Sequence, residues 1–301
     1  MKIFVAGGSG TIGVPLVRAL VSAGHSVTAM TRSPEKQAEL RALGATPALA
    51  DAFDPDALRA AMRQARPEIV IHQLTALPKE GVKRASDIEA TNRLRIEGTR
   101  NLLAAAIAAG ARRFIGGSFA LLPGAMSSPG SGGEPGEAVR SMESQILEAS
   151  RSGKIEGIVL RYGLFYGPGT PSTVSMVRMI QRRRLPVVRG DHGQLPVIHL
   201  DDAVSATVAA LDHGVASGIY DIVDDRPVSM TDIVKAIAEF SGSARPFVVP
   251  AWLPKLIAPY MARMISVRLP LSNARARQEL GWKPRYPTSR DGLADMFSHA
   301  A

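Results

Sequence analysis

Apolar and polar positions follow two alternating periods along the first half of the chain. Short apolar runs, such as residues 2–7 and 67–76, have the length and composition of buried strands. Each is followed by a segment with apolar residues three and four apart, as in residues 11–24, which is the pattern of an amphipathic helix. Strands that alternate with helices form parallel sheets with right-handed crossovers. The pattern therefore predicts an α/β fold with a doubly wound parallel sheet.

The alternation loosens beyond about Gly167, where prolines and short helices become frequent. We predict a first domain over residues 1–166, to which residues 190–225 return, and a smaller C-terminal substrate lobe over residues 167–301. Residues 123–136 are rich in Gly, Pro and Ser, which predicts a mobile loop rather than a folded element.

Composition excludes several classes of protein. Hydrophobic residues make up 46% and charged residues 21% of the 301 residues, as in ordinary globular proteins, and no apolar run reaches the length of a membrane span. The N-terminus runs directly into a strand and a glycine turn, so no signal peptide is expected. With no cysteine, disulfides and thiolate catalysis are excluded, and a cytoplasmic location is the default.

The chain is basic, with a formal net charge of +9, but its basic residues are dispersed and only 5% of its residues are aromatic. A nucleic-acid partner would require a basic stripe with interleaved aromatics or a known module. We therefore expect no nucleic-acid or membrane partner. The positive charge favours small anionic ligands such as phosphorylated cofactors.

A glycine turn follows the first predicted strand and opens the first predicted helix, with glycines at positions 7, 10 and 13. Such glycines allow a tight turn, close approach of a pyrophosphate, and close packing of the helix on the sheet. The helix N-terminus supplies free amides and the positive end of a dipole. This arrangement predicts a Rossmann dinucleotide-binding site.

The end of the second strand indicates which dinucleotide binds. An acidic residue there would bind the ribose hydroxyls of NAD, but the chain has Thr31, Arg32 and Ser33. An arginine and two hydroxyls suit a 2′-phosphate, so NADP is favoured over NAD. Asp51, after the third strand, has two open roles: it accepts a hydrogen bond from the adenine amino group, or it caps a loop or helix.

The order of the segments AGGSGTIG, HQLTA, TNRLRIEGTRNLLAAA, RYGLFYGPG and HLDDAV resembles the extended short-chain dehydrogenase/reductases, and in particular the NAD-dependent epimerase/dehydratase group. The resemblance implies transient hydride transfer at a hydroxyl or carbonyl of a small molecule, and a homodimer is a family-level expectation. By position, it implies that the pyrophosphate is held by Gly7, Gly10, Thr11, Ile12 and Gly13. It implies that the adenine is bordered by Asp51 and Ala52, and that the ribose and nicotinamide are lined by Leu74, Thr75 and Ala76. Residues 162–164 would pass near the nicotinamide.

The chain departs from this family at the proton-transfer site. The family uses a tyrosine whose pKa is lowered by a lysine four residues later, one helical turn away. None of the five tyrosines, at positions 162, 166, 220, 260 and 286, has a lysine at that spacing. Counted back from Glu143 as the helix glutamate of the family, the two positions fall on Pro135 and Val139. Counted back from Glu148, they fall on Arg140 and Ser144.

Other side chains are candidates for the missing proton relay. The family serine position falls on Phe119, one residue after Ser118, so Ser118 has both a catalytic and a structural interpretation. Tyr162 and Tyr166 would place a phenol near the nicotinamide, and His72 ends a predicted sheet strand. These candidates stay open at the level of sequence.

His199, Asp201 and Asp202 form a polar cluster that is predicted to be structural, with the aspartates capping a helix and the histidine anchoring a strand end. No His, Asp or Glu spacing in the chain resembles a metal site.

Two functional hypotheses follow. The first is an NADP-dependent oxidoreductase or an epimerase/dehydratase-like enzyme with a rebuilt proton relay, in which Ser118, Tyr162 and Tyr166 are the catalytic candidates. The second is a non-catalytic NADP(H)-binding sensor, suggested by the missing tyrosine and lysine. In the first hypothesis the partner is a small-molecule substrate.

Overall fold

The computed structural model describes residues 1–78, 82, 85–120, 135–190, 193–257, 262, 268–269 and 271–298. Most of the predicted loop over residues 123–136 lies outside the described residues, apart from 135 and 136, which begin a helix.

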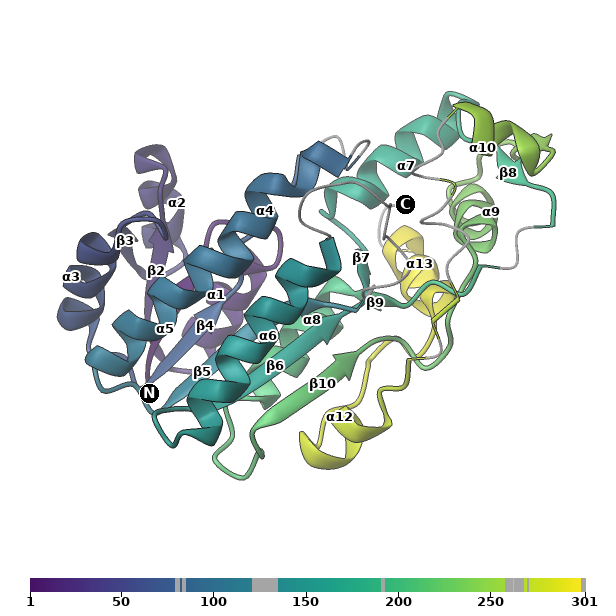
Figure 1. Ribbon diagram of the computed structural model, residues 1–301. Coiled ribbons are helices and arrows are strands. Elements are labelled where there is room, and N and C mark those ends of the chain that lie inside the picture. Colours follow the sequence, from purple (N-terminus) through teal and green to yellow (C-terminus); the bar gives the residue numbers. More distant parts are fainter. Residues whose placement is uncertain are drawn as a thin grey trace.

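A seven-stranded parallel sheet forms the centre of the molecule (Figure 1). Its order is β10-β6-β5-β4-β1-β2-β3, so the chain starts near the middle and winds outward in both directions. The strands are β1 (Lys2–Ala6), β2 (Ser26–Thr31), β3 (Thr46–Leu49), β4 (Ile69–His72), β5 (Arg113–Phe119), β6 (Glu156–Tyr162) and β10 (Gly218–Ile222). The predicted doubly wound Rossmann sheet is confirmed.

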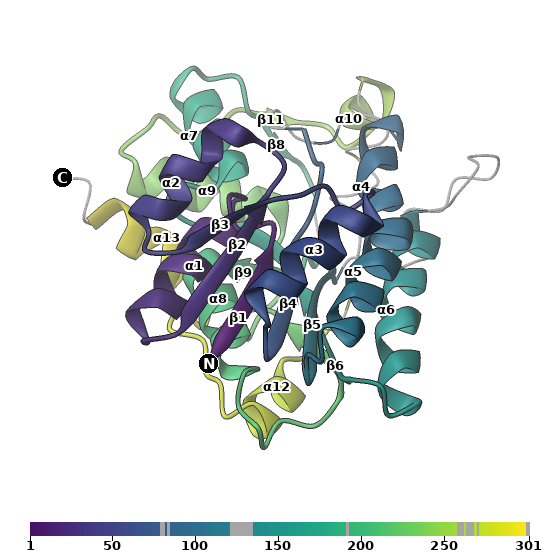
Figure 2. The ribbon, with the colours of Figure 1, turned by 90° about the vertical axis from the view of Figure 1, so that its left-hand side faces the viewer.

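Helices cover both faces of this sheet (Figure 2). On one face lie α1 (Gly13–Ser22) and α8 (Leu200–Ala209); on the other lie α3 (Pro55–Ala65), α5 (Thr99–Ala108) and α6 (Pro135–Arg151), while α2 (Gln37–Ala42) follows β2. Successive side chains of a strand point to opposite faces, and because helices bury both faces the central strands are apolar on both sides. In β1, Ile3 and Val5 join the core under α1, and Phe4 joins the core under α3.

The helix after β4 contains an irregular turn. In place of the predicted continuous helix, the chain forms four consecutive elements: a 3₁₀ turn (Ala85–Ile88), α4 (Glu89–Arg93), a π-helical segment (Leu94–Gly98) and α5. Within the π-helical segment, the carbonyl of Ile96 accepts a hydrogen bond from Gln145 Nε2 of α6 at 3.1 Å. The neighbouring helix thus supplies a donor at a point where helix geometry changes, and π-turns are frequent at functional sites.

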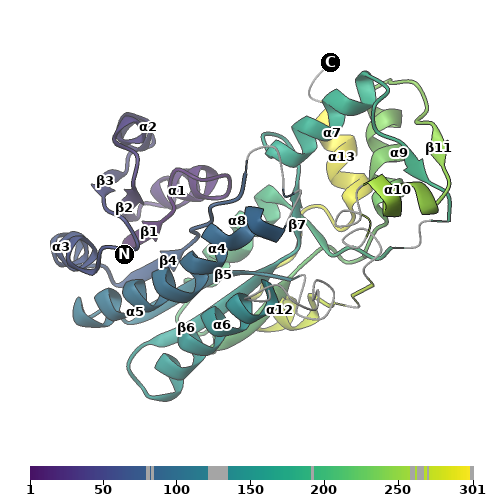
Figure 3. The same ribbon diagram turned by 45° about the horizontal axis from the view of Figure 1, so that its top comes forward.

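The C-terminal lobe gathers at one end of the sheet (Figure 3). It contains α7 (Pro171–Gln181), β8 (Val187–Val188), α9 (Met230–Phe240), β11 (Val248–Val249), α10 (Trp252–Ile257) and α13 (Ser289–Ser298). The short pair of β7 (Leu164–Tyr166) and β9 (Val197–His199) lies between this lobe and the sheet, and α12 (Ala274–Glu279) packs against β10. The domain limits proposed from the sequence stay predictions.

Candidate active site

The glycine turn between β1 and α1 has the shape of a phosphate cradle. Gly7 has a left-handed φ of +90°, and its carbonyl accepts a hydrogen bond from Gly10 N at 3.0 Å. A Cβ on Gly13 would lie 2.0 Å from the Gly7 oxygen, so only glycine fits there. In the described chain, the amides of Thr11, Ile12 and Gly13 have no backbone acceptor. Free amides at a helix N-terminus fit a pyrophosphate, so the residues present suit a dinucleotide.

At the end of β2, hydroxyl groups surround Thr31. The buried Thr31 Oγ1 accepts hydrogen bonds from Ser9 Oγ and from the Ser33 amide, both at 3.2 Å. Arg32 is exposed, and no acidic side chain in the described chain lies within ion-pair distance of it. The structure therefore brings the three predicted residues 31–33 together at one strand end.

The two residues predicted at the adenine edge lie in the turn before α3. Asp51 Oδ1 accepts a hydrogen bond from the Phe53 amide at 2.9 Å, so this carboxylate caps its own loop. Ala52 is buried, and its carbonyl accepts from Asn101 Nδ2 at 2.9 Å. The Arg93 guanidinium covers the Phe53 ring at 4.0 Å, which adds a cation–π contact beside this turn.

The loop of Leu74, Thr75 and Ala76 is held at both ends. The Leu74 amide donates to His72 Nδ1 at 3.2 Å, and the Ala76 amide donates to Thr91 Oγ1 at 3.0 Å, while Thr75 is exposed between them. His72 is buried, with its Nε2 at 3.1 Å from Thr99 Oγ1, and burial lowers its pKa to about 4. It is therefore a neutral histidine that holds the loop in place.

Glu143 of α6 is buried against the sheet and collects three hydrogen bonds. Arg161 donates to it from Nε at 2.7 Å and from a terminal nitrogen at 2.6 Å, and Ser118 Oγ donates at 2.7 Å. Glu148, by contrast, is largely exposed beside Arg151. Glu143 is thus the glutamate that faces the sheet, and the family positions counted back from it are Pro135 and the buried Val139.

Ser118 faces α6, and the next residue faces the other way. Ser118 pairs in register with Arg161, and both contact Glu143. Phe119 packs against the apolar cluster of the C-terminal lobe, together with Leu164 and Met176. The alternation of side chains along β5 therefore places a hydroxyl in an internal network and an aromatic ring toward the lobe.

The two candidate phenols are buried and hydrogen-bonded. Tyr162 OH accepts from Gln73 Nε2 at 2.9 Å and lies 2.7 Å from Thr207 Oγ1, and burial raises its pKa to about 12. Tyr166 OH donates to Asp224 Oδ2 at 3.0 Å, and burial raises its pKa as well. Because Ser118, Tyr162 and Tyr166 each bond to separate partners, the structure does not unite them in one hydrogen-bonded relay.

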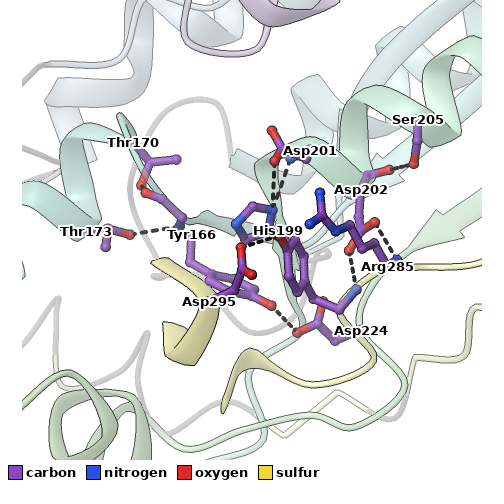
Figure 4. Close-up of polar contacts among 12 residues, drawn as sticks. Tyr166, Thr170, Thr173, His199, Asp201, Asp202, Ser205, Asp224, Arg285 and Asp295 are labelled. Carbon is purple, nitrogen blue, oxygen red and sulfur yellow. Dashed lines mark hydrogen bonds and ion pairs between the residues drawn. The ribbon is translucent and has the colours of Figure 1, made fainter. Parts of the chain in front are cut away.

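The polar network around Tyr166 joins the sheet to the C-terminal lobe (Figure 4). His199, rather than either aspartate, is the N-cap of α8, since its Nδ1 accepts from the Asp201 amide at 3.2 Å. Asp202 accepts instead from the amides of Arg285 and Tyr286, at 2.6 and 3.0 Å. The prediction that the aspartates cap this helix was therefore wrong, because Asp202 accepts hydrogen bonds from a segment more than eighty residues away.

Several site residues were missed by the sequence analysis. Gln73 and Thr207 hold the Tyr162 hydroxyl, and Arg161 holds Glu143. The two-residue period shows which side chains of one strand share a face, but only the register of β5 with β6 places Ser118 and Arg161 on the same face. No local pattern links Gln73 to Thr207.

Two absences concern the described residues alone. No helix in the described part of the chain is long and apolar enough to cross a membrane. Across the same residues, no three His, Asp or Glu side chains are grouped so as to hold a metal ion.

Comparison with known proteins gives a consistent picture. The model of the NAD dependent epimerase/dehydratase family matches residues 3–223. A 3-diazoavenalumate denitrifying reductase from Streptomyces sp is 36% identical, over 97% of this chain and 99% of that protein. A 2-alkyl-3-oxoalkanoate reductase from Stenotrophomonas maltophilia (strain K279a) is 26% identical, over 81% of this chain and 77% of that protein.

A solved structure shares the fold. The UDP-glucose 4-epimerase of Thermus thermophilus, in complex with NAD, superposes with a TM-score of 0.78 at 22% identity, covering 99% of this chain and 98% of that one. Together with the glycine cradle and the family match, these relatives establish the class of the protein. The chain belongs to the NAD-dependent epimerase/dehydratase family and is an NAD(P)-dependent enzyme of the oxidoreductase or epimerase type.

Proposed function

We propose that the protein is an NADPH-dependent reductase whose hydride acceptor needs no proton from the enzyme. The observation that carries this proposal is the composition of α6, where the lysine position counted from Glu143 is the buried, apolar Val139. Reduction of a carbonyl requires an acid at the developing alkoxide. Tyr162 and Tyr166 are buried with raised pKa values, so both phenols resist the ionisation that a family tyrosine undergoes.

An aromatic diazonium group is an acceptor of this kind. A reduced nicotinamide supplies a hydride, and replacement of the diazonium by that hydride gives the arene and N₂, so R–N₂⁺ + H⁻ → R–H + N₂ balances without a proton. Carbonyl reduction, by contrast, consumes one hydride and one proton. The Streptomyces relative is by name a denitrifying reductase of a diazo compound, which supports the same class of acceptor here.

The predicted cofactor residues keep their roles in this proposal. Gly7, Gly10, Thr11, Ile12 and Gly13 would hold the pyrophosphate, Asp51 and Ala52 would border the adenine, and Leu74, Thr75 and Ala76 would line the ribose and nicotinamide. Phe119 and Leu164 would supply the apolar wall toward the C-terminal lobe and exclude water from the acceptor. For Ser118, Tyr162 and Tyr166 we propose positioning roles, because their hydroxyls are engaged within the protein.

NADP is the proposed form of the cofactor. Support comes from the exposed Arg32 and from the Ser9 and Thr31 hydroxyls at the end of β2, where an NAD site would present a carboxylate. The Thermus structure contains NAD, so the choice needs its own measurement. Arg32→Ala should weaken NADPH binding about tenfold and leave NADH binding unchanged. Equal losses for both dinucleotides would contradict the assignment.

The proposed reaction can be followed through the hydride. The protein is incubated with NADPH deuterated at the transferring position and with 4-diazoniobenzoate, and the benzoate formed is analysed by mass spectrometry. We expect enzyme-dependent deuterium in the arene and release of N₂. A simple aliphatic ketone serves as the comparison substrate, and Gly13→Val, in which the cradle is blocked, corrects for direct reaction with NADPH.

Tyr162→Phe and Tyr166→Phe should retain turnover within about threefold, because neither phenol is proposed to transfer a proton. Faster reduction of ketones than of the diazonium, with loss of that activity in either phenylalanine variant, would replace this proposal with a relocated tyrosine site. NADPH binding without hydride transfer to any acceptor would support the sensor hypothesis instead.

A further inference from the structure

Arg95 is a basic side chain near the proposed site, and the carboxylate of Glu143 that attracts it is hydrogen-bonded to Arg161. Arg95 lies in the π-helical segment Leu94–Gly98, and its one hydrogen bond in the described chain runs to Asn92 Oδ1 at 3.3 Å. No carboxylate among the described residues lies within 4 Å of it. Glu143 attracts it electrostatically, but this carboxylate is already bound by Arg161 and Ser118. Among the described residues, Arg95 therefore has no hydrogen-bonded carboxylate of its own.

The location of Arg95 is fixed from two sides. Thr91, four residues earlier and so on the same side of the helix, holds the Ala76 amide of the proposed nicotinamide loop. On the other side, Gln145 of α6 holds the Ile96 carbonyl. The charge of Arg95 also acts on His72, the last residue of β4. Arg95 thus lies at the carboxyl ends of the strands, where ligands bind in open α/β sheets.

The other titratable groups near Arg95 do not neutralise its positive charge. His72 is neutral, because burial lowers its pKa to about 4. Asp221 on β10 acts on Arg161 and is not among the groups that act on Arg95. Burial lowers the pKa of Arg95 to about 10, which still leaves it charged at neutral pH. A partly buried cation without its own counter-ion is costly, and an anionic ligand would offset that cost.

We propose that Arg95 binds the carboxylate of an anionic substrate and so orients it against the nicotinamide. Its planar fork of donors matches a carboxylate in two parallel hydrogen bonds. The phosphates of the dinucleotide would have their own donors in the amides of the glycine turn Gly7–Gly13, so we assign Arg95 to a different anion. This inference deepens the proposed reductase function by adding a substrate class, and its test does not depend on turnover.

The test measures binding by calorimetry. The NADP⁺-saturated protein is titrated with 4-hydroxycinnamate and, separately, with its neutral amide. For Arg95→Met we expect about a 10- to 100-fold loss of affinity for the carboxylate and little change for the amide. Arg95→Lys, which keeps the charge without the fork, should fall between wild type and Arg95→Met. Arg100→Met, an exposed arginine on the same helix run, is the matched control and should bind as wild type.

Three results would overturn the assignment. They are equal affinity of the wild-type protein for the acid and the amide, unchanged acid affinity in Arg95→Met, and a loss of NADP⁺ affinity of the same size as the loss of acid affinity. The comparison of acid with amide on wild-type protein stands even if Arg95→Met does not fold. Failure of the diazonium reaction with Arg95-dependent acid binding intact would reject the proposed acceptor and leave this inference standing.

Discussion

The glycine turn lies at the carboxyl end of β1 and the helix α6 covers one face of the same sheet, and the two regions use their polar groups differently. At the turn, the backbone amides of residues 11–13 have no backbone acceptor in the described part of the chain and are available to a ligand. On α6, the carboxylate of Glu143 accepts hydrogen bonds from Arg161 and Ser118. The comparison teaches that cofactor binding and proton transfer are separable in this fold, because backbone supplies the first and side chains supply the second.

The glycine turn and α6 also differ in how well their function tolerates substitution of side chains. A phosphate cradle depends on the absence of Cβ atoms, so its shape survives changes of the side chains around it. A proton relay depends on particular side chains at helical spacing, and here that face of α6 holds Val139 and Met142 packed in the core. An apolar helix face stabilises the fold through burial while removing the acid from the site.

The largest effect is expected when a side chain blocks the glycine turn. In Gly13→Val, the new Cβ would meet the Gly7 oxygen at 2.0 Å, so the turn must open. We expect NADPH affinity to fall more than about 100-fold, measured by the fluorescence of the bound dinucleotide. Gly214→Ala, which meets nothing closer than 3.5 Å, is the matched control. Retained affinity in Gly13→Val would place the dinucleotide elsewhere.

The structural role of Glu143 on α6 is tested by replacing its buried carboxylate. Glu143→Gln keeps the shape but leaves Arg161 without its counter-ion, so the free energy of unfolding should fall by about 3 kcal/mol. Glu148→Gln, on the exposed side of the same helix, should change it by less than about 0.5 kcal/mol. Urea denaturation of both variants measures the difference. Equal and small losses would mean that Glu143 is not a structural anchor.

A smaller, pH-dependent effect is expected at Asp224, in the network that joins the sheet to the lobe. Burial raises the pKa of Asp224 to about 8, opposed by the Tyr166 hydrogen bond and reinforced by Asp202. The folded state therefore keeps a proton that the unfolded state releases near pH 4, so this group weakens folding as pH rises from about 4 to about 8, and not beyond. Its Oδ1 is buried with no hydrogen-bond partner among the described residues, which agrees with this direction.

Asp224→Asn removes that titration while keeping an acceptor for Tyr166. Relative to wild type, it should gain on the order of 1–2 kcal/mol of stability between about pH 5 and pH 8. Urea denaturation at both pH values gives the comparison, with Glu35→Gln, an exposed acidic side chain that forms no ion pair in the described chain, as control. A difference between wild type and Asp224→Asn that is independent of pH would show that Asp224 is ionised throughout.

Local sequence patterns are enough to predict the doubly wound sheet, the glycine turn and the lack of a Tyr-x-x-x-Lys pair. These are properties of local pattern: hydrophobic period, glycine spacing and helical spacing each involve residues close along the chain. Tertiary structure alone decided that Glu143 rather than Glu148 faces the sheet, and that Ser118 belongs to its network. The same is true of the buried tyrosines and of Arg95, because their environments are built by segments distant in sequence, brought together by strand order and helix packing.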